Sequence, residues 1–260
     1  MAAGCAFAEP ASLGTRVSDV AGKTDTASTA VSHVTVSKNP VTGMEFVFVP
    51  GGCFRMGSDN GNNDEKPVHE VCLSDFFIGK YEVTQGQWRM VMGDNPSRFS
   101  SCGDDCPVEQ VGWNDAQEFI SALNSMTGKK YYLPTEAEWE FACRSGGRDE
   151  IYCGGNDVAS LAWYDKNVAL RTHPVGQKQP NGLGIHDMSG NVWEWVQDWS
   201  GDYSEKRQQD PSGPASSSTR VRRGGSWHYG AKQSRSTWRS SGYPDDRALD
   251  IGFRIMYPGP

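Results

Sequence analysis

Short alternating runs of apolar and polar residues predict strands in the first half of the chain. The run MEFVFVPGG, residues 44–52, alternates as a half-buried strand does, and the run VHEVCL, residues 68–73, alternates in the same way. After residue 150 regular periodicity nearly vanishes, and we expect a loop-dominated region there. Large aromatic side chains are expected to form the core of that region: Trp163, Trp193, Trp195, Trp199 and Trp227.

Two capping boxes and one amphipathic run predict three helices. The strings TQGQ, residues 84–87, and TEAE, residues 135–138, each place a Thr three residues before Gln or Glu, which is typical of a helix start. Between them, residues 114–128 carry apolar side chains at helical spacing, with Asn114 as the expected N-cap and Gly128 as the expected stop. The apolar face comprises Ala116, Phe119, Ile120 and Leu123.

The first forty residues differ in composition from the rest of the chain. Residues 9–40 are rich in Ser, Thr, Ala and Val, and contain no aromatic residue. Such a composition buries too little apolar surface to offset the entropy lost on ordering. We therefore expect a flexible tether over residues 1–40 and one domain over residues 41–260.

The extreme N-terminus predicts export. Ala2-Ala3-Gly4-Cys5 resembles the end of a bacterial lipobox, in which Cys5 would become the lipidated N-terminus after signal cleavage. The string AFA, residues 6–8, fits a signal-peptidase site as the competing interpretation. A lipoprotein of the bacterial outer membrane or cell surface is expected, with the periplasm as the alternative. The lipid would be the only membrane attachment, because the sequence has no run of about 18 apolar residues.

Seven cysteines support an oxidising compartment. Without Cys5 an even number remains, as a disulfide framework requires. A zinc site is the rival hypothesis, but paired CxxC motifs are absent and the five histidines are scattered. The expected disulfides join Cys53 with Cys72, Cys102 with Cys106, and Cys143 with Cys153.

A net charge of −7 argues against a nucleic-acid partner. One stretch near the C-terminus is nevertheless locally basic, and its cations are expected to be solvated or paired with internal carboxylates. These cations are Arg222, Arg223, Lys232, Arg235 and Arg239.

The basic stretch belongs to a segment, residues 223–254, with glycine-bounded ends, RGGSW and IGFR. These ends suit a fixed backbone. The middle lacks period-two alternation, so no strand is predicted there, and Gly230, Gly242 and Pro244 break any helix.

Six strings in order connect the chain with a known family. They are GGCFRMGS, GKYEVTQGQW, LPTEAEWEFACR, PVGQKQPNGLGIHDMSGNVWEWVQDW, RGGSW and GFR, across residues 44–255. Together they resemble the formylglycine-generating-enzyme (sulfatase-modifying factor) superfamily. The resemblance implies an α+β domain with an elaborated C-type-lectin-like fold, little regular secondary structure and small antiparallel sheets.

The enzymes of this superfamily use a copper-binding cysteine pair between the RGGSW and GFR strings. This chain has no cysteine after Cys153, so the thiolate ligands of that site are missing. The related iron-dependent sulfoxide synthases need a histidine-rich helical domain, which the sequence lacks. We therefore expect no catalytic cofactor. An oxidase with an unrecognised copper or other metal site, or an inactive structural relative, is the alternative.

Residues 223–254 also resemble the C-terminal variable region of proteins diversified by bacterial and phage retroelements. Those systems randomise template adenines, so that asparagine AAC codons yield a scattered set of residues. Eleven residues between the framework strings can be coded from AAC by changing its first two bases: His228, Tyr229, Gly230, Ser240, Ser241, Gly242, Tyr243, Asp246, Ala248, Leu249 and Asp250. Trp238 joins them as a candidate, although its template codon would have to differ.

This set of Tyr, Ser, Gly and His residues is similar to an antibody paratope, in which rigid aromatic anchors stand among small polar residues. We therefore expect a non-catalytic, monomeric display protein. Its ligand, a protein or a glycan, would bind through residues 228–250.

The resemblance also implies one structural calcium site. The string HDMSGNVWE, residues 186–194, matches a calcium-binding loop of the enzyme family. By position, Asp187 and Glu194 would supply side-chain oxygens, and Gly190 and Val192 backbone carbonyls; hard oxygen ligands suit calcium. The alternative is a loop whose carboxylates serve only as hydrogen-bond acceptors.

Overall fold

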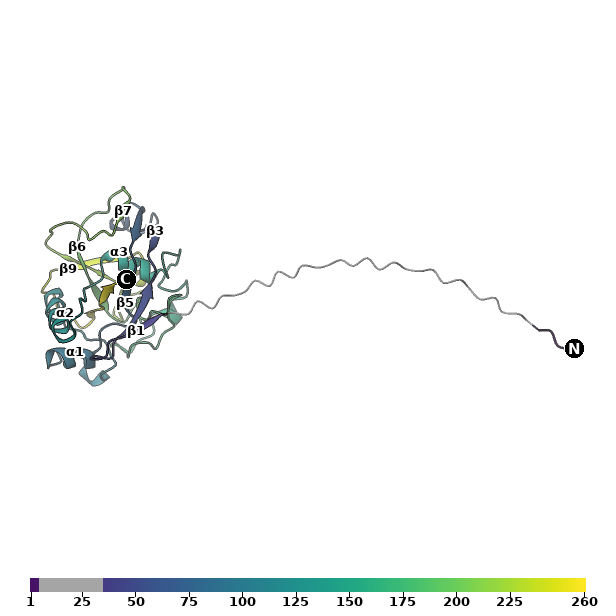
Figure 1. The fold of residues 1–260 in the computed structure, drawn as a ribbon, viewed down its shortest axis with the longest axis horizontal. Coiled ribbons are helices and arrows are strands. Elements are labelled where there is room, and N and C mark those ends of the chain that lie inside the picture. Colours follow the sequence, from purple (N-terminus) through teal and green to yellow (C-terminus); the bar gives the residue numbers. More distant parts are fainter. Residues whose placement is uncertain (5–34) are drawn as a thin grey trace. The chain divides into compact units, whose positions relative to one another are not determined.

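Three small sheets organise the part of the chain that the computed structural model describes, residues 1–4 and 35–260 (Figure 1). The first sheet contains, in spatial order, β1 (Val36–Lys38), β2 (Glu45–Val49), β5 (Phe76–Gly79) and β11 (Met256–Pro258). The second contains β10 (Ile251–Phe253), β6 (Trp193–Trp199), β8 (Arg220–Arg223) and β9 (Arg239–Gly242). The third contains β3 (Gly52–Met56), β4 (His69–Leu73) and β7 (Gln208–Gln209).

Strand pairing is antiparallel except between β10 and β6 and between β4 and β7. The helices are α1 (Gln85–Met92), α2 (Trp113–Thr127), α3 (Glu136–Cys143) and α4 (Val158–Leu161), with single 3-10 turns at Asn63–Glu65, Ser100–Cys102 and Ala231–Ser234. The predicted α+β fold with small, mainly antiparallel sheets is confirmed. None of the described helices is long and apolar enough to cross a membrane.

The predicted helix signals are confirmed at α1 and α3. The hydroxyls of Thr84 and Thr135 accept hydrogen bonds from the backbone of Gln87 and Glu138, which closes both capping boxes. At α2 the apolar face is buried and Gly128 ends the helix with a φ of 67°. The expected N-cap at Asn114 was wrong: Gly112 takes that place, because the Asp115 carboxylate accepts its backbone N–H at 2.7 Å.

Three other expectations need correction. Strand β1 pairs with β2 and lies inside the segment predicted as a tether, so the boundary at residue 40 was too late. Cys5 and the tether from residue 5 to residue 34 lie outside the described residues. The region after residue 150 contains six strands, β6 to β11. Strand β6 escaped the pattern analysis because its charged residues Glu194 and Asp198 are buried together with its tryptophans.

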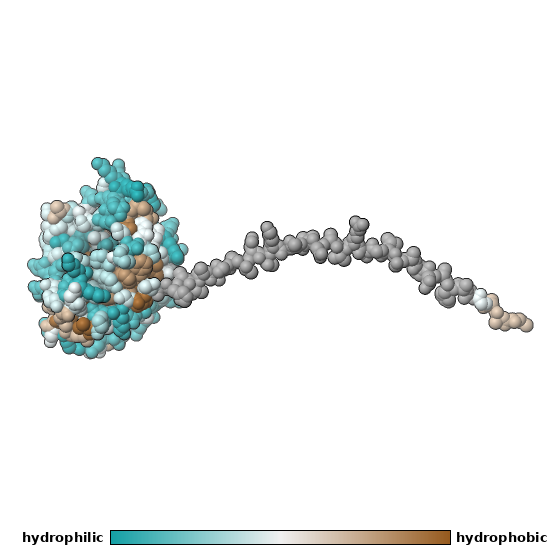
Figure 2. All heavy atoms as spheres, viewed as in Figure 1, coloured by the Kyte–Doolittle hydropathy of each residue, from teal (hydrophilic) through white to brown (hydrophobic). Residues whose placement is uncertain are grey.

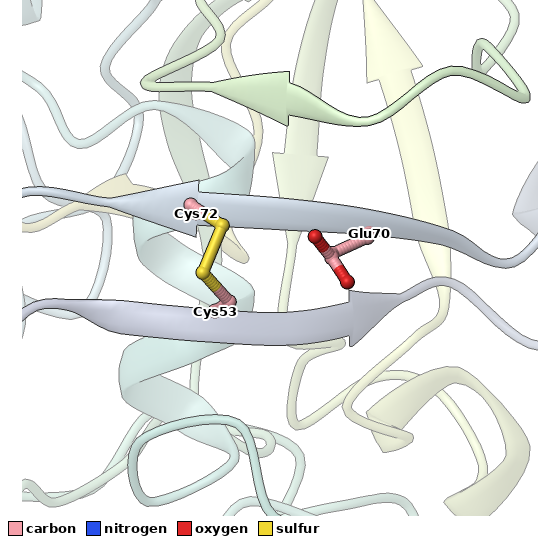
Figure 3. A group of neighbouring side chains, drawn as sticks. All are labelled: Cys53, Glu70 and Cys72. Carbon is pink, nitrogen blue, oxygen red and sulfur yellow. A yellow bond between two sulfur atoms is a disulfide. The ribbon is translucent and has the colours of Figure 1, made fainter.

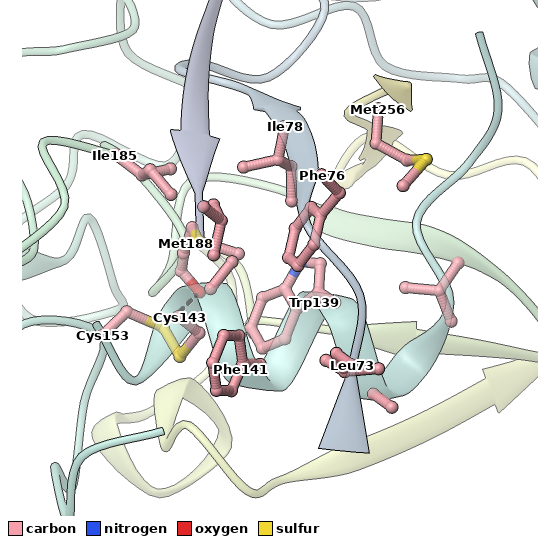
Figure 4. Close-up of a cluster of buried hydrophobic side chains, with 14 of the residues drawn as sticks. Leu73, Phe76, Ile78, Trp139, Phe141, Cys143, Cys153, Ile185, Met188 and Met256 are labelled. Carbon is pink, nitrogen blue, oxygen red and sulfur yellow. Dashed lines mark hydrogen bonds between the residues drawn. A yellow bond between two sulfur atoms is a disulfide. The ribbon is translucent and has the colours of Figure 1, made fainter. Parts of the chain in front are cut away.

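Two hydrophobic clusters form the core. One gathers around Trp139 of α3, which lies among side chains of β4 and β5 (Figure 4). The other joins α1 and α2 to the second sheet through Trp88, Phe119 and Phe253. Of the five tryptophans predicted to form the core after residue 150, Trp193, Trp195 and Trp227 are buried, whereas Trp163 and Trp199 are half-buried.

All three predicted disulfides are present. Cys53 and Cys72 lie directly opposite each other on β3 and β4, with Glu70 beside them (Figure 3). Each disulfide is local in sequence, with separations of 19, 4 and 10 residues. Because their sulfurs are bonded to one another, the six described cysteines offer no thiolate to zinc or copper.

The face of the domain in Figure 2 is mainly hydrophilic, with apolar residues in small groups. Among the large apolar side chains that are exposed anywhere on the described domain, three belong to the predicted variable positions: Tyr229, Tyr243 and Leu249. Scattered exposed hydrophobic residues are common on monomeric proteins. Their concentration in one segment is what directs attention to residues 223–254.

Replacing Trp227 or Phe253 with Ala is expected to lower the free energy of unfolding by about 3–5 kcal/mol, because each change leaves a cavity in a packed aromatic environment. Trp227 is 5% exposed and Phe253 is fully buried. Urea unfolding followed by tryptophan fluorescence measures the loss. Tyr243→Ala is the control, since that side chain is 62% exposed. Equal stabilities for the three variants would contradict this account of the core.

Candidate ligand-binding surface

Buried arginines fix both ends of the 223–254 segment. At the first end, Arg223 is fully buried and donates to Glu140 at 2.5 Å and to the Ser236 carbonyl at 3.0 Å. At the second end, Arg254 forms a bidentate pair with Glu194, with N···O distances of 2.6 and 2.7 Å. In each pair a buried guanidinium is bonded to a buried carboxylate. Charged side chains are tolerated in a protein interior when they are paired in this way.

Glycine is required next to the first anchor. Gly225 has a φ of 75°, and a Cβ there would stand 2.8 Å from the Gln233 carbonyl oxygen. Two residues later, Trp227 donates its backbone N–H to the Asn191 carbonyl at 2.9 Å. The RGGSW string therefore has a fixed backbone conformation, as its glycines predicted.

Aromatic side chains continue from this buried end to the surface. The rings of Trp227, His228 and Tyr229 follow one another edge to face, with centroids 5.2 and 5.5 Å apart. Tyr229 also packs edge to face on Trp193, at 5.6 Å. Tyr229 is 41% exposed whereas Trp193 is 4% exposed. An exposed tyrosine supported in this way loses little conformational entropy when a ligand covers it.

The predicted variable positions differ in exposure. Leu249 is the most informative, because an ordinary loop would bury a leucine, yet its side chain is 38% exposed. Exposed positions are His228, Tyr229, Ser241, Tyr243, Asp246 and Leu249. Half-buried positions are Gly230, Trp238, Ser240, Ala248 and Asp250.

Gly242 corrects the expectation that all variable positions face solvent, because it is buried. A Cβ there would lie 2.8 Å from an Asp246 oxygen and 3.1 Å from both Arg222 and Trp195. The segment also forms a strand where none was predicted: β9 pairs antiparallel with β8. The period-two signal is hidden because the two buried residues of β9 are Arg239 and Gly242.

Side chains at the half-buried positions have structural contacts of their own. Trp238 and Ala248 pack against the second hydrophobic cluster. Asp250 accepts a hydrogen bond from the Ser226 hydroxyl at 2.7 Å. We expect substitutions at these three positions to affect both binding and stability.

A cavity of about 280 Å³ opens among these residues. Half of its lining comes from predicted variable positions: Tyr229, Trp238, Ser240, Ala248 and Asp250. The other half was missed in the sequence and consists of Trp193, Arg222, Gln233, Arg239 and Ile251. Arg222 could have been found from the RVRR string, residues 220–223, because alternate residues of a strand face the same side.

The expectation that local cations pair with internal carboxylates holds for three arginines. Arg223 bonds to Glu140, Arg239 to Glu136 at 2.7 Å, and Arg235 to Glu65 at 2.6 Å. Lys232 is exposed, and its ammonium lies 5.2 Å from the centre of the Trp238 ring. Arg222 is half-buried, and no ion pair of the described residues includes it.

Glu194, one of the four predicted calcium ligands, is already hydrogen-bonded inside the protein. Both Glu194 oxygens accept hydrogen bonds from Arg254, and one of them also accepts the Trp139 indole N–H at 2.6 Å. Glu194 is thus engaged by a guanidinium, and the calcium site with Asp187, Gly190, Val192 and Glu194 stays a prediction.

Asp187 has a different environment. One of its oxygens accepts the Gly176 N–H at 2.6 Å, whereas the other is buried and has no partner. Burial raises the pKa of Asp187 to about 6, and burial together with the neighbouring Asp187 and Glu194 charges raises the pKa of Glu82 well above its usual value. The raised pKa values follow from the burial of three carboxylates close to one another.

The ordered strings, the sheets and the disulfides define a domain of the formylglycine-generating-enzyme type. The chain belongs to the family of the sulfatase-modifying factor enzyme 1-like domain, whose model matches residues 32–257. Among curated relatives, chaperone protein LppX of Paenibacillus barcinonensis is 34% identical over 249 residues, covering 76% of this chain and 83% of that protein. The formylglycine-generating enzyme of Mus musculus is 26% identical over 325 residues, covering 98% of this chain and 86% of the relative.

A solved structure confirms the second resemblance. Treponema denticola variable protein 1 matches with a TM-score of 0.81 and 31% sequence identity, covering 86% of this chain and 99% of that chain. Both resemblances expected from the sequence, to the enzyme superfamily and to variable proteins of the same fold, are therefore confirmed.

Substitutions at the exposed positions should leave the fold unchanged. Tyr229→Ser, Ser241→Asn, Tyr243→Ser and Leu249→Ser are each expected to change the free energy of unfolding by no more than about 0.5 kcal/mol. The matched control on β9 is Gly242→Ser, which should cost about 1–3 kcal/mol because its side chain has no room. Urea unfolding measures both sets. A large loss at Leu249 would show that this position is structural.

The alternative to a calcium site, a loop whose carboxylates serve only as hydrogen-bond acceptors, predicts no stabilisation by calcium through residues 187–194, because Arg254 already neutralises Glu194. The thermal midpoint should be the same in EDTA and in millimolar calcium chloride, as measured by differential scanning calorimetry. A calcium-dependent rise that Asp187→Asn abolishes, while Asp165→Asn does not, would identify Asp187 as a metal ligand.

Proposed function

We propose that the protein is a non-catalytic ligand-binding protein whose display surface is formed by the 223–254 segment. One observation carries the proposal: exposed aromatic and aliphatic side chains stand on a backbone that is fixed at both ends by buried ion pairs. Rigid anchors of this kind bind at low entropic cost, whereas the same residues in a free loop would not. The structural match to a variable protein supports this role.

The proposal separates this chain from its enzymatic relatives. The relative in Mus musculus is a formylglycine-generating enzyme, and the activity of such oxidases depends on reactive thiols. Residues 154–260 of this chain contain no cysteine, and the six cysteines of the described residues form disulfides. The described part of the domain therefore offers no thiolate, the ligand that a soft copper ion requires.

Three disulfides in one domain are typical of proteins outside the cytoplasm. We infer that the protein is exported and displayed at a bacterial surface, with Cys5 as the site of a lipid anchor. The binding role does not depend on this anchor, since the binding segment lies at the opposite end of the sequence. The ligand is a protein or a glycan.

A library of variants tests the proposed function. Randomising the six exposed positions, with all other residues kept, should yield folded binders to a purified test protein after display and selection. The selected variants should melt within a few degrees of the parent. In parallel, the parent incubated with copper and a cysteine-containing sulfatase peptide should form no formylglycine, as measured by mass spectrometry.

Two outcomes would overturn the proposal. Turnover of the sulfatase peptide would make the protein an oxidase. A library whose members mostly fail to fold would show that the six positions are structural. The control library randomises six exposed positions outside the segment, including Met90, Met126 and Leu170; it should fold equally well but yield no binders.

A further inference from the structure

The cavity beneath the display surface is lined by Arg222, which forms no ion pair among the described residues. Arg222 donates from one terminal nitrogen to the Ser241 carbonyl at 2.6 Å. Its Nε is buried and has no hydrogen-bond partner within the described residues. A buried donor without a partner costs about 1–3 kcal/mol, and more when it is charged. Arg222 thus lines the cavity with one terminal nitrogen bonded to a carbonyl oxygen and with no carboxylate bonded to its guanidinium.

An unpartnered Nε also occurs at Arg220 and Arg223, but each of these neighbours differs from Arg222 in its charge partners or its position. Arg223 and Arg239 are both paired with buried glutamates. The Nε of Arg220 is also unpartnered, but the guanidinium is stacked between the rings of Trp199 and Trp113, at 3.4 and 3.7 Å, and does not line the cavity.

Packing holds Arg222 in place. Its guanidinium lies 5.1 Å from the centre of the Trp195 ring, and Gly242 leaves room beside it. Two acidic residues are close enough to attract it, Asp246 and Asp250. Neither forms an ion pair with it. Asp246 accepts the Tyr243 N–H, and Asp250, which also lines the cavity, accepts the Ser226 hydroxyl.

We propose that this cavity binds a single carboxylate side chain, Asp or Glu, of a peptide segment on a protein ligand. Arg222 pairs with the carboxylate, while Tyr229 and Trp238 cover the methylene groups of the bound side chain. This inference rests on the proposed display function and specifies its ligand chemistry. Because Arg222 lies outside the predicted variable positions, every variant of the surface keeps the same anchor.

The size of the cavity and its rim favour a peptide. A volume of about 280 Å³ is large enough for one Asp or Glu side chain. Tyr229 lines the cavity and is exposed, and Tyr243 and Leu249 of the same segment are exposed as well, so they offer contacts to the residues that flank a bound side chain. Interfaces of this form concentrate binding energy in one central pocket surrounded by weaker contacts.

The experiment selects ligands for the parent protein from a random peptide library. Most selected peptides should share an Asp or Glu at one aligned position. Replacing that residue by Gln or Asn in a synthetic peptide should weaken binding at least tenfold, as measured by isothermal titration calorimetry. Arg222→Met should cause a similar loss against the acidic peptide and none against its amide counterpart, because the methionine retains apolar packing on Trp195 but provides no charge.

The control variant is Arg247→Gln, which removes an exposed arginine of the same segment that pairs with Asp115 outside the cavity. It should bind the acidic peptide as the parent does. If Arg222→Met does not fold, the peptide substitution alone still decides the matter. Selected peptides without a shared acidic residue, or with equal affinity after its replacement, would overturn the inference and leave the display function intact. Failure to select any peptide would overturn it as well, while the variant library tests the display function separately.

Discussion

The structure of the binding segment depends on two buried arginines that hold its ends. Arg223 and Arg254 are both fully buried, and each is bonded to a glutamate from a distant part of the chain, α3 for Arg223 and β6 for Arg254. Removing one partner of such a pair would leave an uncompensated buried charge, which typically costs 3–5 kcal/mol. Each end of the segment therefore depends on both partners of its pair being present.

These anchors separate the segment into residues that maintain the fold and residues that are free to change. Trp227 and Ile251 continue the core beyond each arginine, and Gly225 allows the chain to turn. Between them, side chains at exposed positions contact mainly solvent, whereas Trp238, Ala248 and Asp250 serve both roles. A binding surface built in this way combines a fixed framework, including Arg222 of the cavity, with changeable side chains. Selectivity can then change without loss of the fold.

Local sequence signals predicted the structural features that are formed by residues close together in the chain. The capping boxes at Thr84 and Thr135 and the short-range disulfides are of this kind. Strand β6 and strand β9 could not be predicted, because their buried charged residues find partners far along the chain, such as Glu194 with Arg254 and Arg239 with Glu136. The same reason explains why a family motif suggested Glu194 as a metal ligand: the sequence does not show that an arginine sixty residues away occupies it.

The candidate site was predicted in outline only. The exposed aromatic residues were identified from their residue types, which can arise from AAC codons. This criterion needs no knowledge of how the side chains pack. The environment of Gly242 and the unpaired state of Arg222 depend on how β8, β9 and the Trp195 ring meet, and only the three-dimensional structure shows this.

The arrangement of the second sheet also bears on the length of the segment. Strands β8 and β10, which carry its two ends, lie on opposite edges of the same strand, β6. The ends are therefore held two strand spacings apart, about 10 Å, whatever the chain does between them. For a flexible loop, the entropy of closure grows only with the logarithm of its length, and doubling the length costs about 0.6 kcal/mol. Insertions between β9 and β10 can thus enlarge the surface at little cost in stability, so that the scaffold accommodates variation in size as well as in side chains.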